Sequence, residues 1–291
     1  MAEKTNLDPI SGVETTGHEW DGVSELNTPL PRWWLWVFYA CILFAVVYWI
    51  LFPAWPLVSN YTKGVLGYSQ RATVAASLEQ SREAQAPLNQ AIEKASFAEI
   101  NANPALLNFA IASGRAAFAL NCTPCHGRNA QGSPGFPNLN DDKWIWGGTL
   151  EQIQQTITHG IRSGDPDAHE NKMPAFGEDK ILTPEQISDT AEYVLSLSNL
   201  PHDAAAAKRG EAIFHGDGGC TACHGEDGKG NQDVGAPNLT DNIWLYGGTK
   251  EAITHQIFVG HGGVMPAWAG RLDPATIKKL SIYVHSLGGG K

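Results

Sequence analysis

The stretch "NCTPCHGRNAQG" at residues 121–132 contains the unit Cys-x-x-Cys-His, and "GCTACHGEDGKG" at residues 219–230 contains it again. The chain has 291 residues and five cysteines, of which Cys41 alone lies outside these units, within an apolar run. The four motif cysteines are Cys122, Cys125, Cys220 and Cys223. Because four of the five cysteines lie in two copies of the same unit, we expect both units to serve the same chemistry.

Three kinds of site use closely spaced cysteines. A thioredoxin-like redox pair needs a βαβ context, and no alternating apolar run near either unit predicts a sheet. A zinc site needs four ligands; here the cysteine pairs are 98 residues apart and each precedes a His, so zinc is a strained alternative. Covalent attachment of c-type haem uses this pentapeptide, with the thiols on the vinyl groups and the imidazole on the iron. We therefore expect two covalently bound haem c groups, with His126 and His224 as axial ligands.

Methionine supplies candidates for the second axial positions. Apart from Met1, the chain contains only Met173 and Met265, which follow His126 and His224 by 47 and 41 residues. A lone methionine is usually core filler, but two at matching repeat positions, each before Pro-Ala-aromatic, indicate ligands. His/Met ligation raises the reduction potential and is typical of electron-carrying cytochromes c. Elimination gives only this pool of ligands; pairing within each repeat is the default.

The two halves resemble each other well beyond the cysteines. "PNLNDDKWIWGGTLEQI" recurs as "PNLTDNIWLYGGTKEAI" at an offset of 100, and a longer loop precedes the methionine in the first copy. Each copy predicts a helix into the Cys motif, a Gly- and Pro-rich loop, a helix after Gly-Gly-Thr, and a last helix that begins at Thr183-Pro184 or Asp273-Pro274. We predict a mainly α protein with two tandem class-I-like cytochrome c domains, at 111–200 and 201–291.

Some of the remaining residues have a counterpart at the same position of the other repeat, and some do not. Trp144 matches Trp244, and the Pro-Asn-Leu run beginning at Pro137 matches the run beginning at Pro237. We expect the prolines and leucines to pack at the haem edge, and the tryptophans to line the haem pocket or to bond a propionate. Surface or core roles are expected for five histidines without a counterpart, which are His159, His169, His255, His261 and His285.

An apolar run near the start predicts a membrane anchor. "WWLWVFYACILFAVVYWILF" at residues 33–52 has no charge, and about 20 apolar residues cross a bilayer. We expect an uncleaved anchor over residues 33–55, because 32 residues with six acidic and two basic side chains precede the run. Lysine and arginine counts tie across it, so the positive-inside rule gives no orientation. Since c-type haem is attached outside the bacterial inner membrane, where thiols meet an oxidising compartment, residues 1–32 are expected in the cytoplasm and the haem domains in the periplasm.

Residues 56–110 predict a periplasmic helical arm. "SLEQSREAQAPLNQAIEKASFAEI" reads as helical pieces broken at Pro87, with a new helix capped by Asn103 before Pro104. The chain holds 20 basic and 30 acidic side chains, and no basic block suggests nucleic acid. An acidic surface can instead steer a basic partner.

With these features the chain resembles the dihaem subunit (subunit III, or P subunit) of cbb₃-type cytochrome c oxidase. Tandem Cys-x-x-Cys-His domains are widespread, and the specific part is the approach "HEWDGVSELNTPLPRWW" to a single N-terminal span. The resemblance implies an electron-transfer subunit without a catalytic site of its own. Its donor would be a soluble or membrane-bound cytochrome c, and its acceptors a monohaem subunit and the catalytic subunit, where O₂ is reduced to water and protons are pumped. The resemblance also implies crossed ligation, with His126 paired to Met265 and His224 to Met173.

A second reading is a free-standing, membrane-anchored dihaem cytochrome, such as a peroxidase or a donor to another reductase. A peroxidase would need one haem with an open or displaceable axial position. A methionine available for each haem argues against it.

Overall fold

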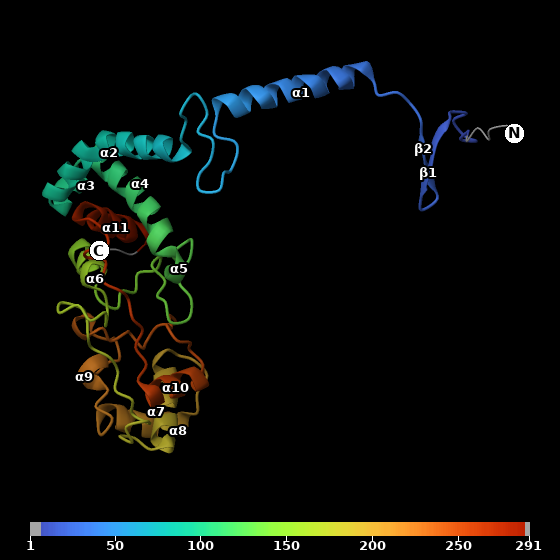
Figure 1. Ribbon diagram of the computed structural model, residues 1–291. Helices are drawn as coiled ribbons and strands as arrows, with labels where there is room; N and C mark the ends of the chain where they lie inside the picture. Colours follow the sequence, from blue (N-terminus) through green and yellow to red (C-terminus); the bar gives the residue numbers. More distant parts are fainter. Residues whose placement is uncertain (1–6, 289–291) are drawn as a thin grey trace. The chain divides into compact units, whose positions relative to one another are not determined.

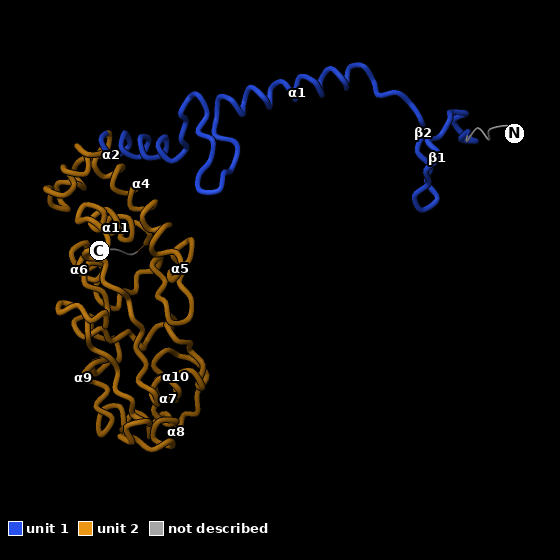
Figure 2. The backbone as a smooth tube through the Cα atoms, viewed as in Figure 1, with its two compact units in different colours: residues 1–83 blue, residues 84–291 orange. Residues whose placement is uncertain are grey.

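The computed structural model describes residues 7–288, and the chain forms two compact units that divide between Glu83 and Ala84 (Figure 2). The first unit contains strands β1 (Thr15–Trp20) and β2 (Val23–Leu26), helix α1 (Arg32–Leu51) and the first half of helix α2 (Gln70–Lys94). The second contains the rest of α2 and all later helices.

The apolar run forms helix α1, a candidate membrane span none of whose residues is buried in the structure. The helix begins directly after Pro31 and ends at Leu51. Phe52 is extended, with φ −116° and ψ 161°, because a residue that precedes proline is pushed out of the helical region. The predicted anchor of residues 33–55 therefore ends in four non-helical residues.

The acidic tail contains a β-hairpin that sequence reasoning did not predict. Strands β1 and β2 pair antiparallel, with Trp20 opposite Val23. The two turn residues between them, Asp21 and Gly22, have φ of 51° and 85°. Positive φ at both positions gives the primed turn that suits the twist of paired strands, and Asp-Gly is a preferred sequence for it. That dipeptide was the available signal.

The predicted helix break at Pro87 is wrong, because α2 runs without interruption from Gln70 to Lys94. A proline inside a helix removes one backbone hydrogen bond, in this case the one to the carbonyl of Glu83. Glu83 is exposed, so water can satisfy that carbonyl. The chain turns only after Lys94, where Ser96 caps helix α3 (Phe97–Ala102) in a capping box with Glu99.

Two matched sets of helices follow. The first repeat supplies α4 (Pro104–Asn121), α5 (Thr123–His126), α6 (Leu150–His159) and α7 (Pro184–Leu197). The second supplies α8 (Ala204–His215), α9 (Thr221–His224), a 3₁₀ turn (Gln232–Val234), α10 (Lys250–Val259) and α11 (Pro274–Leu287). The predicted caps are confirmed, since Asn103, Thr183 and Asp273 each accept backbone N–H bonds at a helix start that carries proline.

The repeats exchange their last helices. Helix α11 packs on α4 and α6, whereas α7 packs on α8 and α10 (Figure 1). We call the α4–α5–α6–α11 assembly the first lobe and the α7–α8–α9–α10 assembly the second lobe. The segments 111–200 and 201–291 mark the sequence repeat, and each packed lobe is built from both of them.

In each lobe one glycine allows two helices to cross in close contact, α4 with α11 in the first lobe and α8 with α7 in the second. In α4, a Cβ on Gly114 would meet the backbone carbonyl of Lys279 and lie 2.7 Å from Cβ of Tyr283, both in α11. In α8, a Cβ on Gly210 would meet the backbone of Asp189 in α7. Both crossings thus bring helix backbones to a separation that only glycine permits.

The arm is fastened to the first lobe through α11. The Lys278 ammonium donates to the carbonyls of Ile92 (3.1 Å), Glu93 (2.9 Å) and Ala95 (2.8 Å) at the C-terminal end of α2. A cation at this end also complements the helix dipole. Arm residues Ile92, Phe97 and Ile100 share a buried cluster with residues of α4 and α11.

We expect Gly114→Ala to lower the free energy of unfolding by about 1–3 kcal/mol, because an added methyl in a tight crossing forces the helices apart. This outcome runs against the helix propensity of alanine, which favours it over glycine by about 1 kcal/mol. Denaturant unfolding of the purified chain measures the change. Ala116→Ser, on the exposed side of α4, serves as control and should change stability by less than about 0.5 kcal/mol. An unchanged or raised stability for Gly114→Ala would contradict the crossing.

Candidate haem-binding sites

Each Cys-x-x-Cys-His unit forms a single helical turn at the end of a longer helix. Helix α5 follows α4 directly and α9 follows α8 after a short loop, with Cys122 and Cys220 at their N-terminal boundaries. The amide of His126 donates to the carbonyl of Cys122, and that of His224 to the carbonyl of Cys220, both at 2.9 Å. This turn brings two thiols and one imidazole together over five residues.

Each histidine of the motif is held by the same hydrogen bond. Nδ1 of His126 lies 3.2 Å from the carbonyl oxygen of Pro137, and Nδ1 of His224 lies 3.0 Å from that of Pro237. A carbonyl only accepts, so Nδ1 carries the proton and Nε2 is left with its lone pair. Burial lowers the pKa of both histidines, while the bond to the proline carbonyl acts in the opposite direction. The geometry therefore favours a neutral imidazole ready to bind a metal through Nε2.

The first cysteine of each unit lies in an apolar environment. Burial raises the pKa of Cys122 to about 11 and that of Cys220 to about 11. Each sulfur is thus held uncharged and packs as a small hydrophobe. A thioether sulfur has the same character, so the environment suits a covalently linked cysteine.

Met265 lies in the first lobe although its sequence belongs to the second repeat. Its side chain packs against the buried cluster of the first lobe, together with Cys122 and Leu139. Its backbone pairs with Ile161, with N–H···O distances of 2.9 Å and 3.0 Å in the two directions. Three residues further on, Trp268 donates to the carbonyls of Ile157 and Thr158 at the end of α6.

Met173 makes the reciprocal crossing. It packs against the buried cluster of the second lobe, which includes Ile253 and Ile257 of α10. Phe176, three residues further on, donates to the carbonyl of Ile257 at 3.2 Å, and Gly177 donates to that of Phe258 at 3.0 Å. The methionine segment of each repeat therefore closes the helix end of the other.

Matched glycines make room for these crossings, and sequence reasoning missed them. Gly160 ends α6 with φ +77°, and Gly260 ends α10 with φ +59°. A Cβ on Gly160 would meet the carbonyl oxygen of Met265, and one on Gly260 would lie 2.5 Å from the carbonyl oxygen of Met173. Their identical place in the two repeats, at an offset of 100, was the signal available.

The longer loop of the first repeat anchors the Met265 segment with an arginine. Nε of Arg162 donates to the carbonyl of Gly263 at 2.7 Å, and Nη1 donates to that of Asn171 at 2.5 Å. The side chain of Asn171 in turn donates to the carbonyl of Val234 at 2.7 Å. The loop thus ties together residues of both repeats.

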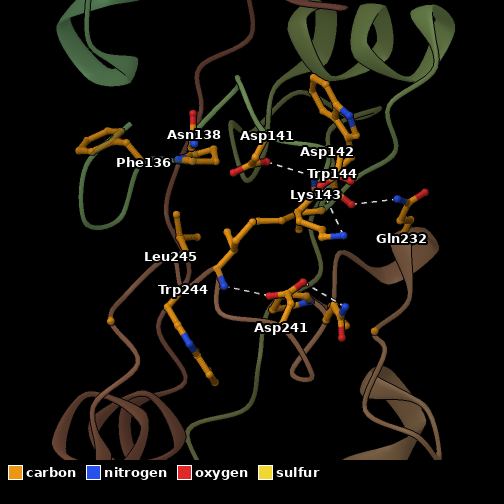
Figure 3. A pocket seen from close by; sticks show the side chains of 18 of the residues that line it. Phe136, Asn138, Asp141, Asp142, Lys143, Trp144, Gln232, Asp241, Trp244 and Leu245 are labelled. Carbon is orange, nitrogen blue, oxygen red and sulfur yellow. Dashed lines mark hydrogen bonds and ion pairs between the residues drawn. The ribbon is translucent and has the colours of Figure 1, made fainter. Parts of the chain in front are cut away.

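A cavity of about 600 Å³ lies between the two Pro-Asn-Leu loops (Figure 3). Its lining comes in matched pairs, which are Pro137 and Pro237, Asn138 and Asn238, Asp141 and Asp241, and Trp144 and Trp244. Trp144 and Trp244 also pack against the buried clusters of the first and second lobe. Burial raises the pKa of Asp141, and the nearby Asp142 and Asp241 carboxylates act in the same direction. The proline that orients each histidine therefore also borders a space shared by the lobes.

Two of the histidines without a counterpart in the other repeat, His159 and His169, have well-defined protein partners. Nδ1 of His159 lies 2.9 Å from Oδ1 of Asp165. His169 stacks on Trp146 with ring centroids 4.2 Å apart, and its Nε2 lies 3.1 Å from the hydroxyl of Thr156. These contacts give both rings a structural role.

The residues of each site fit c-type haem. Each lobe holds a pair of thiols, an imidazole with a free Nε2 and a methionine packed against the same core. Thiol, imidazole and thioether are the donor set of cytochromes c. Together with one apolar helix near the start of the chain that is a candidate membrane anchor, they define a cytochrome with two c-type domains.

Comparison with known proteins identifies the kind of cytochrome. Residues 12–59 match the family described as the N-terminal domain of cytochrome oxidase-cbb3, FixP; residues 111–198 match cytochrome c; and residues 205–284 match cytochrome c oxidase, cbb3-type, subunit III. The cbb3-type cytochrome c oxidase subunit FixP of Azorhizobium caulinodans is 56% identical over 98% of this chain and 96% of its own. Its counterpart from Bradyrhizobium diazoefficiens is 54% identical over the whole of both chains, and subunit CcoP of Azospirillum brasilense is 51% identical. The chain belongs to this family of cbb3-type cytochrome c oxidase subunits, as its sequence predicted.

Gly160 and Gly260, the glycines at the ends of α6 and α10, lead to a prediction for each lobe. Alanine at Gly160 adds backbone strain of about 1–3 kcal/mol, because φ +77° with ψ −168° is a region essentially restricted to glycine, and its Cβ would lie 2.8 Å from the amide of Ala267 in the Met265 segment. We expect Gly160→Ala to displace Met265 and to weaken the long-wavelength absorption band that a methionine sulfur gives on ferric haem. Gly260→Ala should do the same through Met173.

Gly164→Ala is the matched control. Gly164 also has positive φ (+83°), but a Cβ there would meet nothing within 4 Å. This variant should carry the strain alone and keep the band at full strength. Equal loss of the band in Gly160→Ala and Gly164→Ala would mean that strain, rather than the crossing, determines the result.

Proposed function

We propose that this chain is the membrane-anchored dihaem subunit through which electrons enter a cbb3-type cytochrome c oxidase. The observation that carries the proposal is the reciprocal packing of Met173 and Met265, each against the core of the lobe that contains the other repeat's Cys-x-x-Cys-His unit. Each lobe thereby has a full set of donors of the electron-carrier type. The names of the relatives, oxidase subunits FixP and CcoP, supply the complex in which the carrier works.

Each lobe has a defined set of proposed ligands. In the first lobe Cys122 and Cys125 form the covalent links, and His126 and Met265 supply the axial donors. In the second lobe the corresponding residues are Cys220, Cys223, His224 and Met173. Haem c, when bound, supplies a one-electron iron couple. The proline carbonyls keep each imidazole in the coordinating tautomer, and the apolar cores keep water away, which favours a fixed ligand set and a raised reduction potential.

The proposed topology follows from where c-type haem is attached. Residues 1–32 lie in the cytoplasm, α1 crosses the bacterial inner membrane and contacts its lipid, and the arm and lobes lie in the periplasm. A donor cytochrome c, soluble or membrane-bound, delivers electrons there. The chain passes them to the monohaem and catalytic subunits of the oxidase, which reduces O₂ to water with proton pumping, and it has no catalytic site of its own.

A free-standing peroxidase, or a donor to another reductase, is the alternative function. A peroxidase needs one haem whose sixth position opens to substrate. Both methionine segments are instead tied by backbone hydrogen bonds to a helix end of the other repeat. Such tethering favours electron transfer over peroxide chemistry.

Ligand pairing can be tested one haem at a time. In the chain carrying Cys220→Ala and Cys223→Ala, only the first haem remains attached, and we expect Met265→Ala to abolish the long-wavelength band while Met173→Ala leaves it. In the full dihaem chain either substitution alone should halve the band. The opposite pattern in the single-haem chain would establish pairing within each repeat. A band unaffected by either substitution would overturn the electron-carrier assignment.

A further inference from the structure

The hairpin of β1 and β2 presents an unpartnered surface. None of the described residues 7–31 is buried. Trp20 and Val23, which lie opposite each other across the strands, are 70% and 69% exposed. An isolated two-stranded hairpin is at best marginally stable in water. A large aromatic and a β-branched residue side by side on such a sheet favour a partner that covers them.

The charge of the same segment restricts the partner. Residues 7–31 hold five carboxylates, on Asp8, Glu14, Glu19, Asp21 and Glu25, and no lysine or arginine. The cytoplasmic leaflet of a membrane is itself negative and would repel this segment. A cationic protein surface would attract it, and complementary charge also fixes the register of docking.

The position of the hairpin restricts the partner further. Only five residues, 27–31, separate β2 from α1, so the hairpin lies within about 22 Å of the start of the span even if they are fully extended. Pro29 and Pro31 limit the freedom of this link. On the cytoplasmic face, the loops of membrane proteins carry an excess of lysine and arginine close to their spans. Positively charged protein surfaces are therefore found on the cytoplasmic face at the same distance from the membrane as the hairpin.

We propose that the acidic hairpin docks on a lysine- and arginine-bearing cytoplasmic loop of a membrane-spanning partner subunit of the oxidase. The carboxylates pair with the basic loop, and Trp20 and Val23 cover apolar surface beside it. This inference rests on the cytoplasmic position of residues 1–32 in the proposed function. The hairpin fixes the subunit on one side of the membrane while the haem lobes work on the other.

Photo-crosslinking in the intact membrane complex tests the contact. A photoreactive phenylalanine analogue is placed at Val23 of the full-length, haem-loaded chain, and crosslinked peptides are identified by mass spectrometry. The expected product joins Val23 to a basic cytoplasmic loop of a membrane-spanning oxidase subunit. The same probe at the exposed Val58, beyond the other end of α1, should give no such product. Crosslinks from Val23 only to lipid, to a soluble protein or within the chain would overturn the proposal.

Charge reversal tests the chemistry of docking. The triple variant Glu14→Lys, Glu19→Lys and Glu25→Lys should lower recovery of partner subunits per haem by about tenfold at low salt, since each ion pair contributes modestly and the three act together. Glu79→Lys, Glu83→Lys and Glu93→Lys, a matched reversal on exposed residues of α2, should lower it less than twofold. Equal recovery with both triple variants would overturn the proposal.

A labelling control separates this proposal from the proposed function. In spheroplasts, an impermeant maleimide should label Ser59→Cys and leave Ser24→Cys unlabelled, since these exposed residues lie on opposite sides of α1. Labelling of Ser24→Cys would overturn the topology and the docking together. The expected labelling with unchanged partner recovery in the hairpin variant would overturn the docking alone.

Discussion

The structure of both lobes depends on the backbone hydrogen bonds that satisfy the C-terminal carbonyls of α6 and α10. A helix leaves its last carbonyls without internal partners, and a buried helix end must find donors elsewhere. Helix α6 obtains them from the segment that follows Met265, and α10 from the segment that follows Met173. Glycine at the end of each helix makes the approach possible. The same backbone interaction, used twice, thus completes each helix and brings the methionine of one repeat to the helices of the other.

The chemical identity of the site could be predicted from the sequence, because Cys-x-x-Cys-His and the two methionines are local signals with few competing explanations. Helix starts were equally predictable, since Asn103, Thr183 and Asp273 each combine a capping side chain with a following proline. The crossed methionine pairing was implied only by the resemblance to a known family, and the exchange of the terminal helices was not predicted. Both repeats have the same local pattern of helices, caps and apolar positions, so α11 could pack on α4 or on α8 without any change in local preference. Only long-range packing, through sites such as Gly114 and Gly160, distinguishes the two arrangements.

Other differences from expectation have local causes. Pro87 lies in the interior of α2 because the carbonyl that loses its partner is exposed. The tail hairpin escaped prediction because its strands are short and polar, and only the Asp-Gly turn marks them. The two lobes also differ in support. The first lobe is braced by the arm through Lys278 and a shared buried cluster, and its methionine segment is tied by Arg162.

The exchange of terminal helices has a consequence for synthesis and folding. Helix α4 begins at Pro104 and its packing partner α11 at Pro274, so the first lobe closes only after 170 further residues have been made. Contacts so distant in sequence form late, and the incomplete chain exposes apolar surface until they do. A chain cut between the repeats would not leave one finished cytochrome domain; it would leave a first lobe without its terminal helix and a helix α7 without its lobe. Each lobe therefore needs segments of both repeats before it can close, and a truncated product exposes the apolar surface that the missing segments would cover.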